Sequence, residues 1–144
     1  MTVTAVAYTL AGLIAAGIIF IGARFILAPR VAAAGYGVQP DLGQPSTGAY
    51  LSVKGVRDIA SGLFVFILMA AGATHLLGWV ILAATIIPLA DAAIVLGHGG
   101  PKSIALSVHG LTAAVMLITS ALLLISYGAR PATFTDPQNP TASC

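Results

Sequence analysis

Long apolar runs alternate with short polar segments along the chain, and these runs predict four membrane-spanning helices. They cover residues 3–23, 51–73, 76–96 and 104–127. Each has about the 20 residues that a helix needs to cross a hydrocarbon core of about 30 Å. Because backbone polar groups in lipid need internal partners, the runs predict helices and not strands. We therefore expect an all-α integral membrane four-helix bundle with up-down topology.

The connections between the runs differ in length and composition. Residues 30–50 are punctuated by Gly and Pro from Gly35 to Gly48, which predicts one long loop without a continuous helix. Loops of this length are binding loops or lids, or simply mobile. The Pro-containing polar segment over 129–144 predicts a disordered tail. Residues 1–128 then form a single transmembrane domain.

Two features inside the apolar runs predict how the helices pack. Small residues recur at four-residue spacing, for example Ala11 with Ala15, and allow helix backbones to approach closely. Pro88 lies inside the third run, three residues before Asp91. A proline there predicts a kink with a carbonyl freed one turn earlier.

The positions of the basic residues predict the orientation. No basic residue precedes the first run, and Arg24 and Arg30 follow it, which is the pattern of a retained helix and not of a signal peptide. Lys54, Arg57 and Lys102 flank connections that an up-down bundle places on the same side as Arg30. The excess of Lys and Arg marks the cytoplasmic side. We expect a multi-pass protein of the cell membrane with both termini outside.

Composition then limits the classes of function. The chain of 144 residues is 58% hydrophobic and 7% charged, whereas soluble domains carry about 25% charged residues. The lipid bilayer is therefore the expected partner. No run of Lys and Arg supports nucleic-acid binding. The single cysteine, Cys144, excludes an intramolecular disulfide and a Cys-rich metal or iron–sulfur site.

The ionisable residues of the apolar runs converge on one half of the expected bundle. Arg57 and Asp58 open the second run, Asp91 lies late in the third and His109 early in the fourth. Charges in hydrocarbon are costly unless paired, so they should face the interior. Lys54 and Asp58 are four residues apart and can pair directly. Between helices, Arg57 with Asp91 and Asp58 with His109 are both open pairings.

This layer predicts a candidate catalytic site. Asp91 and Asp58 are the candidate acid–base residues, His109 a proton shuttle, and Arg57 a stabiliser of an anion or enolate. Arg24 and Lys54 are candidates for substrate binding. In the alternative interpretation, Arg24 and Lys54 are interfacial anchors, Arg57 and Asp58 form a structural lock, and His109 is a packing residue.

Metal and cofactor chemistry has little support in the pattern. The three histidines lack a helical His-x3-His spacing and nearby Glu, so we predict no metal site and no haem. No phosphate loop, dinucleotide fingerprint or nucleophile motif is present, so no cofactor is predicted.

Two functions remain open, and a third is weaker. The first is an acid–base enzyme acting on a small lipophilic molecule. The second is a non-catalytic accessory subunit. A transporter is the weaker third reading, because four spans need a homo-oligomer to form a pathway.

Three stretches resemble an uncharacterised family, one with a domain of unknown function, of small four-span membrane proteins. They are Arg24-Phe-Ile-Leu-Ala-Pro-Arg30, Gly35-Tyr-Gly-Val38 and the segment 50–62, with its specific Lys-Gly-x-Arg-Asp element. More distantly, the chain is similar to the DoxX-like membrane proteins. The resemblance implies a four-helix fold without a settled activity. Similarly built membrane proteins include oxygenases and isomerases of lipophilic compounds, an analogy that transfers no residue roles.

Overall fold

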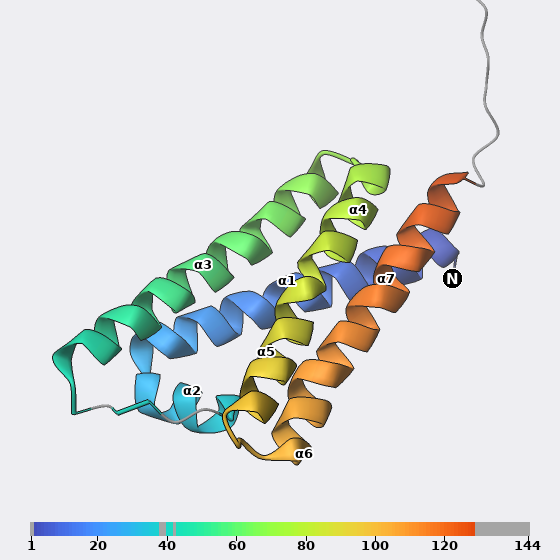
Figure 1. The fold of residues 1–144 in the computed structure, drawn as a ribbon. Coiled ribbons are helices and arrows are strands. Elements are labelled where there is room, and N and C mark those ends of the chain that lie inside the picture. Colours follow the sequence, from blue (N-terminus) through green and yellow to red (C-terminus); the bar gives the residue numbers. More distant parts are fainter. Residues whose placement is uncertain (1, 38–39, 42, 129–144) are drawn as a thin grey trace, which may run out of the picture.

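The secondary structure is all α-type, with no strand, within residues 2–37, 40–41 and 43–128, which are the residues that the computed structural model describes. The predicted tail over 129–144 lies outside them. The segments follow each other as shown in Figure 1. They are α1 (Val3–Leu27), α2 (Pro29–Tyr36), α3 (Pro45–Ala70), α4 (Thr74–Ala84), α5 (Ile86–Gly97), α6 (Lys102–Ile104), the π-helix η1 (Ala105–Gly110) and α7 (Leu111–Gly128).

Three stretches are long and apolar enough to cross a membrane. They are Val3–Leu27, Thr74–Gly97 and Lys102–Gly128, with 25, 24 and 27 residues. At about 1.5 Å per residue each exceeds the roughly 30 Å of a hydrocarbon core. These helices indicate a membrane-embedded protein, as the composition predicts.

Helix α3 is as long as these stretches but is not one of the three. It has 26 residues and carries Lys54, Arg57 and Asp58 near its middle. The helix begins at Pro45, six residues before the predicted run at 51, because proline is well accommodated at the first position of a helix. The second predicted span is therefore a long helix with a charged centre.

The predicted long loop over 30–50 is partly helical. Helix α2 occupies its first part, beginning with Pro29 at the first helical position and ending at Tyr36. The next residue, Gly37, caps the helix with a φ of 94° in the left-handed region. The alanines of 32–34 favour a helix. The Gly and Pro residues thus mark the ends of two helices in this segment, where the sequence pattern predicted a continuous loop.

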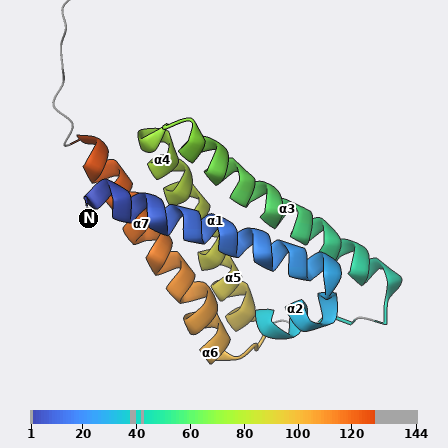
Figure 2. The same cartoon turned by 180° about the vertical axis from the view of Figure 1, so that it is seen from behind.

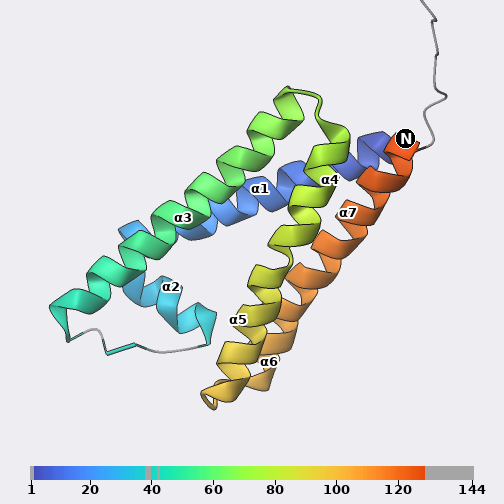
Figure 3. The same ribbon diagram turned by 45° about the horizontal axis from the view of Figure 1, so that its top comes forward.

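The helices form two antiparallel pairs that meet at one end and splay apart at the other (Figures 1 and 2). One pair is α1 with α3, and the other is the α4–α5 stretch with α7. At the narrow end, buried side chains of α1, α4 and α7 form the apolar core, including Ala7, Leu77, Ile81 and Leu123. At the wide end, α2 lies between α3 and α5, as the tilted view shows (Figure 3).

Close backbone contact between α1 and α3 depends on glycine. A Cβ on Gly22 would lie 2.5 Å from the Gly55 carbonyl oxygen, and a Cβ on Gly55 would lie 2.5 Å from the Gly22 oxygen. Two turns further along α3, a Cβ on Gly62 would lie 2.7 Å from the Ala15 carbonyl oxygen. Small residues at such crossings permit the dispersion contacts that hold membrane helices together. This contact sets the position of Lys54 and Asp58 against α1.

The α4–α5 stretch is interrupted at Thr85, in the turn before Pro88. Proline lacks the N–H that would bond the carbonyl of residue 84. The Thr85 hydroxyl donates to the Ile81 carbonyl at 2.9 Å and so occupies a carbonyl in this turn. The interruption is the irregularity that Pro88 predicts, and α5 carries Asp91 beyond it.

Candidate functional site

Tyr36 enters the wide end of the molecule from the last residue of α2. The chain turns at Gly37, where a Cβ would lie 3.0 Å from the side chains of both Ile104 and Val95. A Cβ on Gly100 would lie 2.5 Å from the Gly37 carbonyl oxygen. The end of α2 therefore packs tightly on the connection between α5 and α6. This contact brings Tyr36 to His109 in η1.

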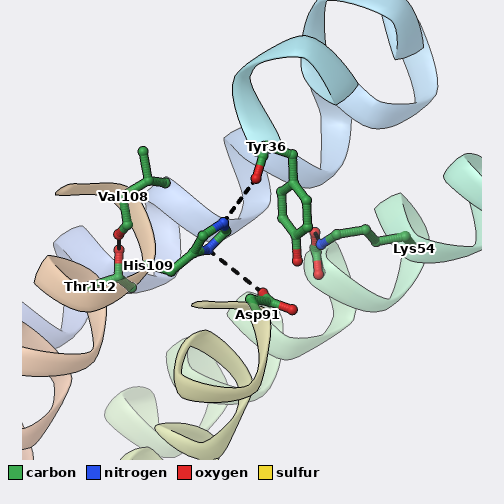
Figure 4. A network of polar contacts seen from close by, with 7 residues as sticks. Tyr36, Lys54, Asp91, Val108, His109 and Thr112 are labelled. Carbon is green, nitrogen blue, oxygen red and sulfur yellow. Dashed lines mark hydrogen bonds and ion pairs between the residues drawn. The ribbon is translucent and has the colours of Figure 1, made fainter. Parts of the chain in front are cut away.

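His109 is buried, with 4% of its surface exposed, and lies in the π-helix η1. The wider π turn leaves carbonyl groups that side chains occupy. The Thr112 hydroxyl donates to the Val108 carbonyl at 2.6 Å (Figure 4). The Ser107 hydroxyl donates to the Ser103 carbonyl at 2.6 Å. Short π segments inside α-helices are frequent at functional sites.

The two ring nitrogens of His109 have different partners (Figure 4). Nε2 lies 3.0 Å from the Tyr36 carbonyl oxygen. A carbonyl oxygen can only accept a hydrogen bond, so Nε2 carries the hydrogen and acts as the donor. Nδ1 faces Oδ2 of Asp91 at 3.9 Å. The hydrogen bond to the backbone therefore sets the tautomer, and Nδ1 is the nitrogen left for exchange with the carboxylate.

Asp91 and His109 form a pair that can hold one proton in two ways. The proton can reside on Nδ1, which gives an imidazolium beside a carboxylate, or on Oδ2, which gives two neutral groups. At 3.9 Å the two atoms are too far apart for a direct hydrogen bond. The side chain of Asp91 is 22% exposed, so a further group can reach it. This arrangement can take up or deliver a proton.

The Tyr36 side chain lies at the centre of an aromatic group. Its ring meets the His109 ring edge-on at 4.8 Å between centroids and the Phe25 ring edge-on at 5.7 Å. Burial raises the pKa of the Tyr36 phenol well above its ordinary value, and the nearby Asp91 carboxylate raises it further. Tyr36 therefore stays protonated and can donate a hydrogen bond at any physiological pH.

Lys54 links α3 to both rings. Its Nζ donates to Oδ2 of Asp58 at 2.7 Å and lies 4.8 Å from the ring centroids of Phe25 and Tyr36. The side chains of Lys54 and Asp58 are 29% and 14% exposed. An ammonium over aromatic faces gains cation–π attraction that grows as water is excluded. The ion pair and the two rings thus join α1, α2 and α3 at one point.

An apolar pocket of about 230 Å³ opens beside Lys54 and Tyr36. Both residues belong to its wall, but the surface that they present to the pocket is apolar. Apolar side chains and one proline form the rest, namely Phe25, Ala33, Pro40, Leu51 and Ile94. The pocket is therefore apolar, and the Tyr36 ring in its wall also contacts the His109 ring.

A model of one protein family matches residues 15–123, which include every residue of this cluster. The chain belongs to the family described as Domain of unknown function (DUF4267). No curated protein and no solved structure gave a significant match. Membership of DUF4267 confirms the predicted likeness to an uncharacterised family. The more distant likeness to DoxX-like proteins and the four-span description stay predictions.

In this DUF4267 chain, four of the six predicted site residues come together. Asp91 and His109 face each other, and Lys54 pairs with Asp58 as the four-residue spacing predicts. Tyr36 lies between the two pairs. Within the described ranges, no group of three or more His, Cys, Asp and Glu is placed to hold a metal ion.

The other two predicted residues lie apart from the DUF4267 cluster. Arg57 is exposed. Gly55 and Asp58 occupy the inner side of α3, and the side chain of Arg57, which lies between them in the sequence, therefore points away from that side. Arg24 is half-buried, with its guanidinium 5.9 Å from the Phe20 ring on its own helix. The ion pairs of the described residues are Lys54–Asp58 and His109–Asp91. Neither Arg57–Asp91 nor Asp58–His109, the two pairings left open by the sequence, is among them.

Sequence reasoning missed Tyr36 and Phe25 as parts of the DUF4267 site. Tyr36 stands between Gly35 and Gly37 in a segment interpreted as a loop. The available signal was an aromatic residue at the end of an alanine-rich stretch, directly before a glycine that can end a helix. Phe25 carried no such signal, because apolar residues surround it in the first run.

Proposed function

We propose that the protein is a membrane-embedded acid–base enzyme that acts on a small lipophilic molecule. The observation that carries this proposal is the Asp91–His109 pair, placed inside helices that could cross a membrane and next to an apolar pocket. An ionisable pair in such helices is costly and is usually functional. Its pairing distance of 3.9 Å leaves the carboxylate able to serve another group.

In this mechanism Asp91 takes a proton from a carbon or oxygen of the bound molecule. His109 exchanges a proton with Asp91 through Nδ1, while its Nε2 stays bound to the Tyr36 carbonyl. The protonated phenol of Tyr36 stabilises the negative charge that develops, the role that the sequence assigned to Arg57. Asp58 holds Lys54 at the pocket and does not take part in the transfer.

Deuterium transfer tests the proposal without a known substrate. Wild-type protein in mild detergent and deuterated water would be incubated with a lipophilic extract of the cells that make it. We expect at least one compound to gain deuterium, and Asp91→Asn to slow the gain by about 100-fold or more. Asp41→Asn changes an exposed carboxylate and serves as the matched control. Absence of a labelled compound, or equal labelling by Asp91→Asn, would contradict the proposal.

A non-catalytic accessory role is the second candidate, and the Lys54–Asp58 pair favours it. This pair and its two aromatic contacts join three helices, as a structural lock would. In that role Asp58→Asn would lower the melting temperature, and the double exchange Lys54→Asp with Asp58→Lys would restore part of it. No compound would then gain deuterium in the first experiment.

We also propose that α3 crosses the membrane, which would complete four spans with both termini outside. Helix α3 runs antiparallel to α1 in close contact at Gly22 with Gly55 and at Ala15 with Gly62. The last part of α3, from Ile59 to Ala70, is uncharged. Two of its three central charges, Lys54 and Asp58, pair within the cluster, and membrane helices tolerate charges that face such an interior.

A further inference from the structure

Arg57 is an exposed cation in the middle of α3, on the side turned away from the contact between Gly55 and α1. We infer that its guanidinium binds the phosphate of an anionic phospholipid, whose acyl chains lie along the same face of α3. The inference rests on the proposed crossing of α3, which puts this face in contact with lipid, and not on the proposed enzyme. It gives a role to the arginine that lies outside the cluster.

The charge of Arg57 is not balanced within the part of the chain that the structure describes. The carboxylates there belong to Asp41, Asp58 and Asp91, and each of them is bonded to or faces another group. Lys54 and Asp58 neutralise each other at 2.7 Å, so Arg57 leaves this part of α3 with a net positive charge. A charge on a lipid-facing helix is costly unless an opposite charge meets it. The site therefore needs an anion from outside the described chain.

The residues that share the outer face of α3 with Arg57 are apolar or aromatic. Tyr50 and Val53 precede it by seven and four residues, and Phe64 follows it by seven. Residues at this spacing lie on one side of a helix, and all three side chains are exposed. In a membrane such a stripe contacts acyl chains, and a tyrosine near the start of the helix suits the level of the headgroups. A lipid can therefore lie along the stripe with its phosphate at Arg57.

The direction of α3 brings the guanidinium toward the headgroups. Arg57 lies about 9 Å along the helix axis beyond Leu51, where the predicted apolar run begins. Helical side chains lean toward the N-terminus of their helix, and α3 begins at the wide end of the molecule (Figure 1). The long side chain of Arg57 therefore extends toward the membrane surface at that end. A phosphate there can accept two parallel hydrogen bonds from the planar guanidinium.

The same charge argues against a second copy of the chain as the partner of this face. Two copies that cross the membrane in the same direction are related by an axis along the membrane normal, so a dimer through α3 would place identical residues opposite each other. Two Arg57 guanidinium groups would then repel each other in a medium of low dielectric constant. A lipid phosphate supplies the opposite charge instead. An anionic lipid matches the site better than a zwitterionic one, whose own ammonium competes for the phosphate.

Quenching of a single tryptophan by brominated lipids tests the inference. The sequence has one tryptophan, Trp79, which is exposed on α4. Phe64→Trp in a Trp79→Phe background moves this reporter to the stripe that contains Arg57. The protein would be reconstituted in vesicles of phosphatidylcholine and phosphatidylglycerol, with bromine on the acyl chains of one lipid or the other. The two quenching curves give the relative affinity of the two lipids for the surface beside the reporter.

We expect position 64 to select phosphatidylglycerol over phosphatidylcholine by about fivefold, the effect of one basic residue at the membrane surface. Arg57→Gln should remove the preference. Arg57→Lys should keep part of it, because lysine keeps the charge but not the paired donors. Arg30→Gln removes another exposed arginine and should leave the preference unchanged, which makes it the matched control. The native Trp79, on another helix, should show no preference.

Equal affinity of the two lipids at position 64 would overturn the inference, and so would a preference that survives Arg57→Gln. Absence of quenching by either lipid would also overturn it, and the emission of the reporter then separates two causes. Red-shifted emission would place the stripe in water, so the crossing of α3 would fail as well. Blue-shifted emission would show that protein covers the stripe, so the crossing would stand with a second copy on this face. Deuterium transfer tests the enzyme proposal independently of all these outcomes.

Discussion

His109 has a structural contact and a chemical one on opposite sides of a single ring. Nε2 donates to the Tyr36 carbonyl at 3.0 Å, and this hydrogen bond fixes the end of α2 to η1. Nδ1 faces Asp91 and remains free to exchange a proton. A buried backbone carbonyl that loses its donor destabilises the fold, whereas the loss of a proton carrier affects only chemistry. The two roles can therefore be separated by substitution.

Substitution of His109 by Gln and by Ala makes this separation. Glutamine keeps an N–H donor for the Tyr36 carbonyl, whereas alanine leaves that carbonyl without its partner. We expect His109→Ala to lower the free energy of unfolding by about 1–3 kcal/mol more than His109→Gln does. Both should abolish deuterium transfer. Denaturant or thermal unfolding in detergent measures the difference, and equal stabilities would show that the hydrogen bond contributes little.

The phenol of Tyr36 predicts a stability difference at alkaline pH. Its pKa is raised in the folded protein above the ordinary value of 10.0, so the folded state keeps a proton that the unfolded chain releases. Stability from this group is complete below about pH 10 and decreases as the pH rises further, by about 1.4 kcal/mol per unit. Tyr36→Phe lacks this decrease.

Melting temperatures of the wild type and Tyr36→Phe between pH 8 and pH 11 measure the effect of the phenol. The other tyrosines and the lysines are present in both proteins, so the difference between the two curves isolates Tyr36. We expect the curves to run parallel below pH 9 and the wild type to lose stability faster above pH 10. Parallel curves over the whole range would mean that the phenol ionises in the folded protein as it does in water.

At the scale of the elements, the contact between α1 and α3 is the feature most sensitive to a single methyl group. Gly22→Ala places a Cβ 2.5 Å from the Gly55 carbonyl oxygen, a backbone atom that cannot move alone. We expect a loss of about 1–3 kcal/mol in unfolding free energy. Gly17→Ala in the same helix meets nothing within 4 Å and should be neutral or gain up to about 1 kcal/mol from helix propensity. Thermal unfolding of the matched pair tests the contact.

The elements were predictable to different degrees for physical reasons. Long uncharged runs have one solution in lipid, so an all-helical protein follows from them directly. The interruption near Pro88 also follows, because proline removes a particular hydrogen bond. Helix α2 was missed because Gly and Pro mark helix ends as well as loops. Whether Gly37 ends a helix or belongs to a longer loop depends on its packing against Val95, which no local pattern contains.

The same distinction holds for the site. Depth in the bilayer follows from position along a run, so Asp58, Asp91 and His109 were predicted to share a layer. The partner of each depends on rotation about the helix axis, and a change of one residue turns a side chain by about 100°. Arg57 therefore points outward although Asp58 beside it is half-buried. The part played by Tyr36 needed the path of α2, which only the folded chain defines.

For the whole molecule, the splayed arrangement places two helices with basic residues at the same end. Helix α2, which contains Arg30, and α6, which begins at Lys102, lie at the wide end, and the α3–α4 turn lies at the other end (Figure 1). Because basic residues mark the cytoplasmic side, the wide end and its pocket should face the cytoplasm. The α3–α4 turn, which has no Lys or Arg, should then face outward.

Single cysteines in a Cys144→Ser background test both the orientation and the crossing of α3. The substitutions are Ser46→Cys in the first turn of α3, Ala71→Cys directly after α3, and Ser103→Cys on α6. All three positions are exposed. We expect an impermeant maleimide added to intact cells to label position 71 and to reach positions 46 and 103 only after lysis. Labels on the same side at positions 46 and 71 would show that α3 does not cross, leaving three spans. Labelling reversed at all three positions would leave four spans and turn the pocket toward the outer face.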